Sequence, residues 1–234
     1  MVSRNKWFLG IVVLVLIAGS VWYYFTLPKA PKEVDGIAEY DSLAPQTTYK
    51  KVSLRPFKHL VVNCDLGPVK VYVEADSKSF IELHRTFMKY VEMNYKGDTL
   101  LIHTLKTPKS TKENPIERQI YLHTSDIQSY WGEVTQTFFS NFVTKSLTVN
   151  SRSSYIRFIG CEIENLKLTT NKACNYVLDQ SSSFNRIDAR VNTSSALTCL
   201  AHIQTELRLT TLNLQYITLS QQNASKLRIV KANK

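Results

Sequence analysis

Six basic side chains recur at strand-like intervals between residues 167 and 228 of the 234-residue chain. They are Lys167, Arg186, Arg190, Arg208, Lys226 and Arg228. If the segments that carry them are strands of one sheet, the cations gather on one outward face, which could hold an anionic glycan or membrane headgroups. Asp188 and Glu206 interrupt the series, so a solvated charged face without a ligand is the alternative.

Three histidines, His84, His103 and His123, end three similar apolar segments at spacings of 19 and 20 residues. In stacked coils of that length they would form a column of imidazoles, which can bind a metal. No obvious carboxylate is available to orient them, and a hairpin expected between them would break the column. We therefore expect surface or structural histidines and no metal site.

The acidic residues do not form a catalytic constellation. Those in the repeats from residue 147 onward are Glu162, Glu164, Asp179, Asp188 and Glu206, and they do not recur at one position of successive coils. The chain also has no nucleophile elbow, phosphate-binding loop or zinc motif. We expect no catalytic residue and no cofactor. A polysaccharide-degrading β-helix enzyme remains the rival function, because such enzymes act through clustered carboxylates.

Four cysteines, at positions 64, 161, 174 and 199, form no CxxC pair and have no metal-ligand spacing. Cys174 and Cys199 could form a disulfide if their strands were neighbours in an oxidising compartment. Small buried thiols in a β core are the commoner alternative. The cysteines therefore define no framework for the fold.

The elements that must position these residues are visible as a repeat of short apolar pairs. From residue 147 onward, apolar residues stand at i and i+2, and successive pairs begin nine to eleven residues apart. The pairs are 147/149, 156/158, 166/168, 176/178, 187/189, 197/199, 207/209, 217/219 and 227/229. The residue between the two members is polar in every pair except that of Val177. This alternation predicts nine short strands, each with one face in a core and one in water.

Strands at this spacing fit either an antiparallel sandwich or a β-solenoid with two strands in each coil of about 20 residues. Tight hairpins depend on glycine, yet no glycine follows Gly160 and no proline follows Pro115. The connections are instead rich in Asn, Ser and Thr, which stacked coils can align into hydrogen-bonded ladders. The predicted fold is all-β, a parallel β-helix over residues 57–234.

The earlier half of that domain keeps a similar but less regular pattern. Its apolar pairs are 60/62, 71/73, 81/83, 91/93, 100/102 and 120/122. The sequence Lys96-Gly97-Asp98 predicts a hairpin turn, so this half is expected to be partly antiparallel. Residues 107–115 read as a loop insertion.

The N-terminal segment Trp7–Leu27 is uncharged and apolar. As a helix its 21 residues span about 31 Å, which matches the hydrocarbon core of a bilayer. Aromatic residues at 22–25 suit a membrane interface rather than a signal-peptide cleavage site. We expect a cytoplasmic stub and single transmembrane helix over residues 1–27, a proline-bearing linker over 28–56, and a C-terminal domain in the periplasm or outside the cell.

The net charge of +10 invites a nucleic-acid interpretation, but no run of Lys and Arg exceeds two residues. A basic domain outside the cytoplasm attracts anionic polysaccharide, lipopolysaccharide or lipid phosphate equally well. We therefore expect no nucleic-acid partner.

Three short motifs resemble a known bacterial family. They are Phe57-Lys58-His59-Leu60, Gly67-Pro68-Val69-Lys70-Val71 and Gly97-Asp98-Thr99-Leu100, followed by the repeats. This arrangement is similar to the head GIN domain family of auto-transporter adhesins, common in Bacteroidota, over about residues 57–230. The resemblance implies a β-helical, exported domain and supplies no catalytic residues.

The sequence as a whole predicts a membrane-anchored extracytoplasmic interaction protein, adhesin-like and without catalysis. Its expected partners are the membrane, through residues 7–27, and an anionic polysaccharide or another envelope protein. The two rivals are the polysaccharide-degrading enzyme and a structural or signalling module of the envelope.

Overall fold

The computed structural model describes residues 48–64, 68–105, 118–191, 194–211 and 216–231. The expected membrane segment 7–27 and the loop 107–115 lie outside these ranges. Within them, no helix is both long enough and apolar enough to cross a membrane.

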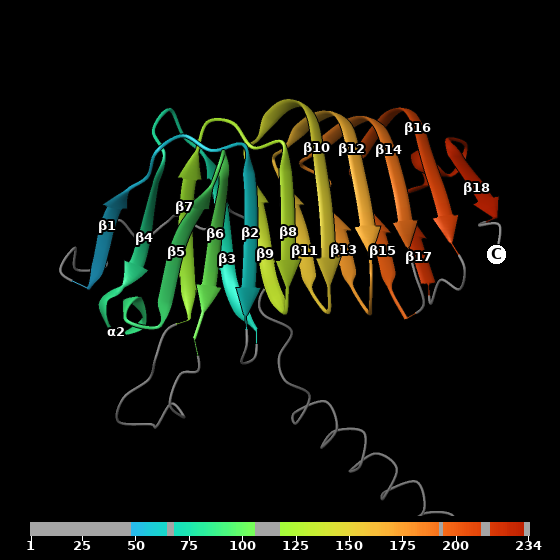
Figure 1. The fold of residues 1–234 in the computed structure, drawn as a ribbon. Coiled ribbons are helices and arrows are strands. Elements are labelled where there is room, and N and C mark those ends of the chain that lie inside the picture. Colours follow the sequence, from blue (N-terminus) through green and yellow to red (C-terminus); the bar gives the residue numbers. More distant parts are fainter. Residues whose placement is uncertain (1–47, 65–67, 106–117, 192–193, 212–215, 232–234) are drawn as a thin grey trace, which may run out of the picture. The chain divides into compact units, whose positions relative to one another are not determined.

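Two nine-stranded sheets form the described domain (Figure 1). Sheet A contains, in spatial order, β1 (Tyr49–Ser53), β4 (Phe80–His84), β7 (Gln119–Thr124), β3 (Val69–Ala75), β9 (Thr135–Ser140), β11 (Tyr155–Ile159), β13 (Asn175–Leu178), β15 (Ala196–Cys199) and β17 (Tyr216–Leu219). Sheet B contains β18 (Leu227–Lys231), β16 (His202–Thr211), β14 (Ser183–Val191), β12 (Glu162–Thr170), β10 (Val143–Arg152), β8 (Ser129–Glu133), β2 (His59–Cys64), β6 (Thr99–Thr104) and β5 (Val91–Lys96). The helices α2 (Arg85–Met88) and α3 (Gln221–Ala224) are short. The prediction of an all-β domain is confirmed.

From β8 onward, consecutive strands alternate between the two sheets, and each pairs in parallel with the next strand of its own sheet. In sheet B, Val149 stands beside Leu168, Leu168 beside Ala189, and Ala189 beside Leu209. These neighbours are about 20 residues apart in sequence, as the repeat of apolar pairs predicts. Their side chains are buried, so the alternation correctly identifies the inward face of each strand.

The N-terminal part is mixed, as expected. Strand β4 runs antiparallel to both β1 and β7, and β5 forms an antiparallel hairpin with β6. The hairpin turns at Gly97, whose φ of 65° lies in the left-handed region that glycine adopts without strain. The hairpin prediction at Lys96–Asp98 is therefore confirmed.

Three strands lie where the sequence did not indicate them. The linker prediction for 28–56 is wrong at its C-terminal end, because Tyr49–Ser53 forms the edge strand β1. Its two lysines disguise it, although lysine is common on sheet edges. Strands β8 and β9 bury Tyr130, Thr135 and Thr137, so their inward faces lack the aliphatic alternation.

Side-chain oxygens hold the turns of adjacent coils together. Ser154 Oγ accepts from the backbone N–H of Thr135 at 3.2 Å, and Ser182 Oγ accepts from that of Cys161 at 3.1 Å. Ser195 Oγ does the same for Cys174 at 3.1 Å, and Asn223 Oδ1 for Ile203 at 3.3 Å. All four acceptors are buried. The expected polar ladders therefore exist, but mainly as serine to backbone bonds between coils.

All four cysteines are buried, and none of them forms a disulfide. Cys174 precedes β13, whereas Cys199 stands beside Leu178 at the far end of that strand. The pairing considered from the sequence is absent because the two thiols lie at opposite ends of neighbouring strands.

Replacing Ser195 by alanine tests the turn bonds. Ser195→Ala leaves the buried Cys174 N–H without its acceptor, so the free energy of unfolding should fall by about 1–3 kcal/mol. Denaturant unfolding followed by circular dichroism measures the change. Ser146→Ala, at an exposed position of β10, is the control and should stay within about 0.5 kcal/mol of the parent. Equal losses in the two variants would contradict this role for Ser195.

Candidate functional site

The basic residues predicted from the sequence lie along the outward side of sheet B. Lys167, Arg190 and Arg208 are exposed on β12, β14 and β16, and Arg186 and Arg228 are exposed on β14 and β18. Lys226 directly precedes β18 and is half-buried. In register, Lys167 stands beside Asp188, Asp188 beside Arg208, and Arg208 beside Arg228. We call these six residues and the two intervening carboxylates the sheet B face.

Three of the six cations are already engaged. Glu206 accepts Arg186 at 3.3 Å and Arg228 at 3.5 Å, both through carboxylate oxygens of a side chain that is 17% exposed. The Lys226 ammonium donates to the backbone carbonyl of Ile203. These contacts satisfy the cations locally and leave them less available to a ligand.

The other three cations are open. Lys167, Arg190 and Arg208 make no ion pair or side-chain hydrogen bond with any described residue, and all are exposed. Asp188 lies between Lys167 and Arg208 in the ladder, and its Oδ1 is buried with no hydrogen-bond partner in the described part of the chain. The open cations therefore surround one carboxylate, which lowers but does not cancel the local positive potential.

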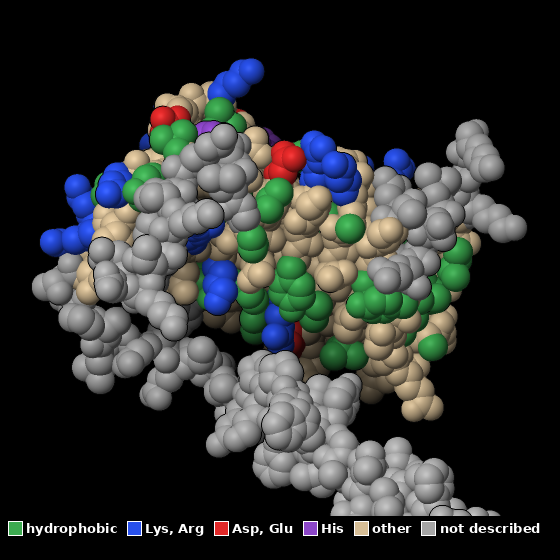
Figure 2. Space-filling view, turned by 90° about the horizontal axis from the view of Figure 1, so that it is seen from below, with side chains coloured by type: hydrophobic (Ala, Val, Ile, Leu, Met, Phe, Trp, Pro, Cys, Tyr) green, Lys and Arg blue, Asp and Glu red, His purple; other side chains and the backbone are tan. Residues whose placement is uncertain are grey.

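The view from below in Figure 2 limits how far this basic character extends. Lys and Arg side chains on that side are scattered between polar and apolar ones, and no continuous basic patch appears among the described residues in view. The described basic side chains on that side therefore form no single surface.

A shallow groove of about 380 Å³ opens at the N-terminal ends of β10, β12, β14 and β16, in the same sheet as the open cations. Its lining residues are Val143, Thr144, Lys145, Glu162, Ile163, Glu164, Ser183, Asn185 and Gln204. The strand ladder is interrupted there by a bulge between Phe184 and Arg186. Amide, hydroxyl and carboxylate groups in such a groove can hydrogen-bond to sugar hydroxyls.

The groove does not resemble a glycosidase site. Glu162 and Glu164 line it, but both are exposed on one strand and no aromatic side chain is among the lining residues. Glycoside hydrolysis needs a general acid whose pKa is raised by burial, opposite a second carboxylate. The geometry supplies neither the burial nor the opposing placement.

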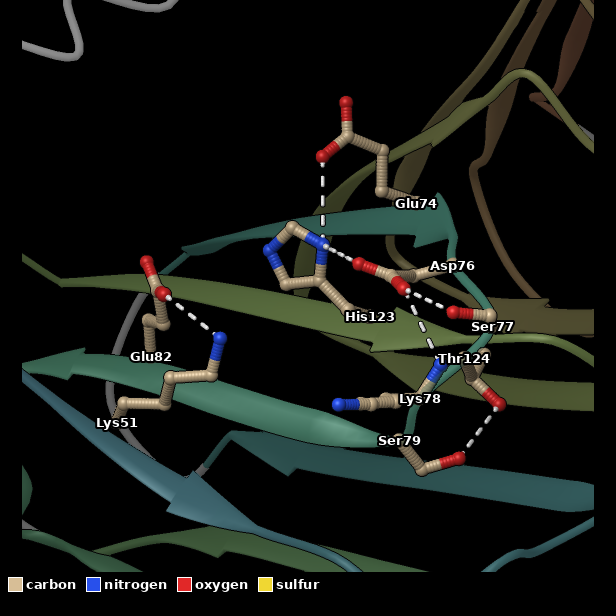
Figure 3. A network of polar contacts seen from close by, with 9 residues as sticks. All are labelled: Lys51, Glu74, Asp76, Ser77, Lys78, Ser79, Glu82, His123 and Thr124. Atoms are coloured by element: carbon tan, nitrogen blue, oxygen red, sulfur yellow. Dashed lines mark hydrogen bonds and ion pairs between the residues drawn. The ribbon is translucent and has the colours of Figure 1, made fainter.

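The histidine column considered from the sequence does not form. His84 and His123 belong to antiparallel strands of sheet A, and His103 belongs to sheet B. His123 instead lies near two carboxylates, with Nδ1 3.5 Å from Glu74 and 3.8 Å from Asp76 (Figure 3). Its ring stacks on that of Phe80 at 4.1 Å. Among the described residues, no group of His, Cys, Asp and Glu could hold a metal.

Asp76 in this network is also held by its own turn. The N–H of Lys78 donates to Asp76 Oδ1 at 3.1 Å, and the Ser77 hydroxyl donates at 3.2 Å (Figure 3). The bond from the Lys78 N–H contributes most to lowering the pKa of the Asp76 carboxyl, and the Ser77 hydroxyl and nearby His123 lower it further, against the opposing effect of desolvation. The network is a polar surface arrangement that joins β3, β4 and β7.

A row of aromatic rings on the outward face of sheet A is a feature that sequence reasoning missed. Tyr72 stacks on Tyr121 at 4.8 Å and on Phe138 at 5.1 Å, with interplanar angles of 9° and 14°. Tyr49 and Tyr155 extend the row at its two ends. Because the stacked faces are occupied by one another, the row stabilises the stack rather than offering faces to a ligand. The sequence feature that could have revealed this row is one aromatic residue at an outward position in each of β3, β7 and β9.

Next to this row, Arg157 of β11 binds Asp179. Burial alone would raise the pKa of the Asp179 carboxyl, but hydrogen bonds from the Arg157 guanidinium and from Ser181 outweigh it and hold that pKa below its ordinary value. The Asp179 side chain is 17% exposed.

Comparison with known proteins bears on the fold. No family model matches the chain, and no curated protein matches it. The structure of a protein named "putative adhesin" from Parabacteroides distasonis superposes with a TM-score of 0.55 at 14% identity, covering 79% of this chain and 78% of that one. Proteins of the same name from Bacteroides fragilis and Parabacteroides merdae give TM-scores of 0.46 and 0.42 at 12% and 11% identity. These cover 78% and 80% of this chain and 94% and 96% of theirs.

The first of these likenesses extends over most of both chains and shows that the two share a fold.

The Arg157–Asp179 pair predicts a pH dependence. Because the folded-state pKa of Asp179 is depressed, its ionised form adds stability above the unfolded value of 3.8, and that stability is lost as the pH falls through the folded value. Asp179→Asn should therefore lower the melting temperature at pH 7 and have little effect by about pH 2. Glu82→Gln, which removes an exposed ion pair of 4.0 Å, is the control and should change little at either pH. If the melting temperature of the Asp179→Asn variant lay below that of the parent by the same amount at every pH, the stabilising role of the Asp179 charge would be contradicted.

Proposed function

We propose that this chain is a membrane-tethered, non-catalytic interaction protein of the bacterial envelope, whose parallel β-helical domain of the head GIN type binds anionic polysaccharide. The binding surface is the sheet B face together with the adjoining groove. The single observation that carries the proposal is the presence of three exposed cations, Lys167, Arg190 and Arg208, that lack partners among the described residues and point outward from one sheet.

Charge supports a polyanion as the ligand. Lys167 and Arg208 lie two strands apart across sheet B, so they are separated by roughly 10 Å at the usual strand spacing. A single small anion cannot contact both cations well, whereas a polymer with repeated acidic groups can. The net charge of +10 adds long-range attraction that raises the rate of encounter.

The groove supports a sugar rather than a lipid. Asn185 and Gln204 offer both donors and acceptors, and the Ser183 hydroxyl adds to them, which suits the hydroxyl groups of a glycan. The single strongly exposed apolar side chain of the lining is Val143, at 75%. A lipid-binding surface requires a larger apolar area than this groove provides.

The tether is part of the proposal. The apolar segment Trp7–Leu27 is long enough to span a bilayer, and Arg4 and Lys6 before it favour a cytoplasmic N-terminus. That orientation puts the β domain on the outer side of the membrane, where anionic envelope polysaccharide is found.

Binding of dextran sulfate and polygalacturonate tests the proposal. Lys167→Gln combined with Arg208→Gln should weaken binding of at least one of them about tenfold or more, and should reduce the dependence of affinity on salt, because two cationic contacts are lost. Biolayer interferometry at several salt concentrations measures both effects. The control neutralises Lys50 and Lys70, which are exposed on sheet A. If both double variants weakened binding equally, the interaction would depend only on the net charge of the protein. That result would contradict binding at a defined face.

Glu206 should restrain the same binding. Glu206→Gln removes the carboxylate that holds Arg186 and Arg228, so two further cations become available and the affinity for dextran sulfate should rise several-fold. The same interferometry measures this change, with Glu92→Gln on the exposed side of β5 as the charge-matched control. An increase no larger than that of the control would mean that the engaged arginines lie outside the binding surface.

A further inference from the structure

Among the described residues, the two strands of the C-terminal coil each have a neighbouring strand on one side only. β17 and β18 are the terminal strands of sheets A and B (Figure 1). One coil earlier, the inward residues Leu207 and Leu209 are buried. Their partners Leu227 and Ile229 are half-buried and 63% exposed respectively. The inward apolar side chains of the described domain therefore become exposed to solvent at the end formed by β17 and β18. We call this the open end.

The outer backbone edge of β18 also lacks a neighbouring strand among the described residues. The N–H and C=O groups of β18 that point away from β16 have no strand beside them among the described residues. Such a row pairs most readily with another β-strand, because a strand satisfies donors and acceptors at the same spacing. The chemistry of the edge therefore calls for a strand as its partner.

The opposite end of the domain is protected. Arg55 lies over the ring of Tyr95, a residue of the edge strand β5, at 4.0 Å, and the hydroxyl of Tyr95 donates to the Arg55 carbonyl. The other edge strand, β1, has exposed lysines at positions 50 and 51. Lysines on an edge disfavour pairing with another chain. Head-to-tail stacking of two copies would have to displace these groups.

We propose that the open end pairs with the same end of a second copy, so that two chains form a closed dimer with two-fold symmetry. In an antiparallel pairing of β18 centred on Ile229, this residue faces Ile229 of the second copy, and Arg228 faces Val230 of that copy. No two like charges are opposed, and apolar side chains meet across the axis. A two-fold contact of this kind closes on itself and leaves no further edge at that end.

Disulfide formation at position 229 tests the pairing in the full-length chain, solubilised in detergent. Opposed residues of antiparallel strands have Cα atoms about 4.5–5.5 Å apart, within the range that a disulfide bridges. Ile229→Cys should therefore give a dimer under mild oxidation on a non-reducing gel, and the four native thiols are buried and should not contribute. The control is Val143→Cys, a similarly exposed site away from the end, which should remain monomeric.

A second variant separates pairing from chance collision. Ile229→Asp places two carboxylates opposite each other, so the dimer should weaken at least tenfold by light scattering while the circular dichroism spectrum stays that of the parent. The dimer is ruled out if the parent chain is monomeric at about 50 μM and the Ile229→Cys variant forms no disulfide. It is also ruled out if the Val143→Cys variant cross-links as readily as the Ile229→Cys variant. Pairing with a strand of another protein would leave the Ile229→Cys variant without a self-disulfide and would overturn the proposal.

Discussion

The arrangement of this domain depends on how its turns satisfy their backbone groups. Tight turns usually employ glycine, yet none occurs after Gly160. Instead, a buried hydroxyl or amide oxygen from the next coil accepts a backbone N–H at or just before the start of a strand about 20 positions earlier, as Ser154, Ser182, Ser195 and Asn223 do. An unmet buried N–H costs about 1–3 kcal/mol, so each such bond favours one registration of a coil on its neighbour.

That registration decides what the outer faces can do. Once coils are stacked with a shift of about 20 residues, side chains from distant parts of the sequence become neighbours along each sheet. On sheet A the same effect does not depend on that shift, because β3 lies between β7 and β9 and so brings Tyr72, Tyr121 and Phe138 into a stacked row. On sheet B the shift puts Glu206 between Arg186 and Arg228, so that a carboxylate from one coil controls cations from two others. Which side chains become neighbours on the outer faces therefore depends on how the strands are paired, and not on any local sequence motif.

Much of the fold could be predicted from the sequence because its apolar residues alternate with polar ones at a constant period. The pairs 147/149 to 207/209 are all buried, and the Gly97 hairpin is where its turn residues indicated. Strands β8 and β9 could not be predicted, since Thr135 and Thr137 are buried by hydrogen bonding to Tyr130 rather than by hydrophobicity. The histidine column failed for a related reason. A spacing of 19 or 20 residues does not reveal strand direction or which sheet a strand joins.

The sheet B face was predictable in composition but not in availability. The sequence identifies six cations at outward positions, yet whether each is open depends on a partner one coil away. Glu206 engages two of them, and the carbonyl of Ile203 engages Lys226. Cations aligned at about 5 Å between neighbouring strands repel one another, and Asp188 and Glu206 relieve that repulsion in the free protein. A polyanion that binds there would take over the same role, so the carboxylates that stabilise the unbound face also set a limit on its affinity.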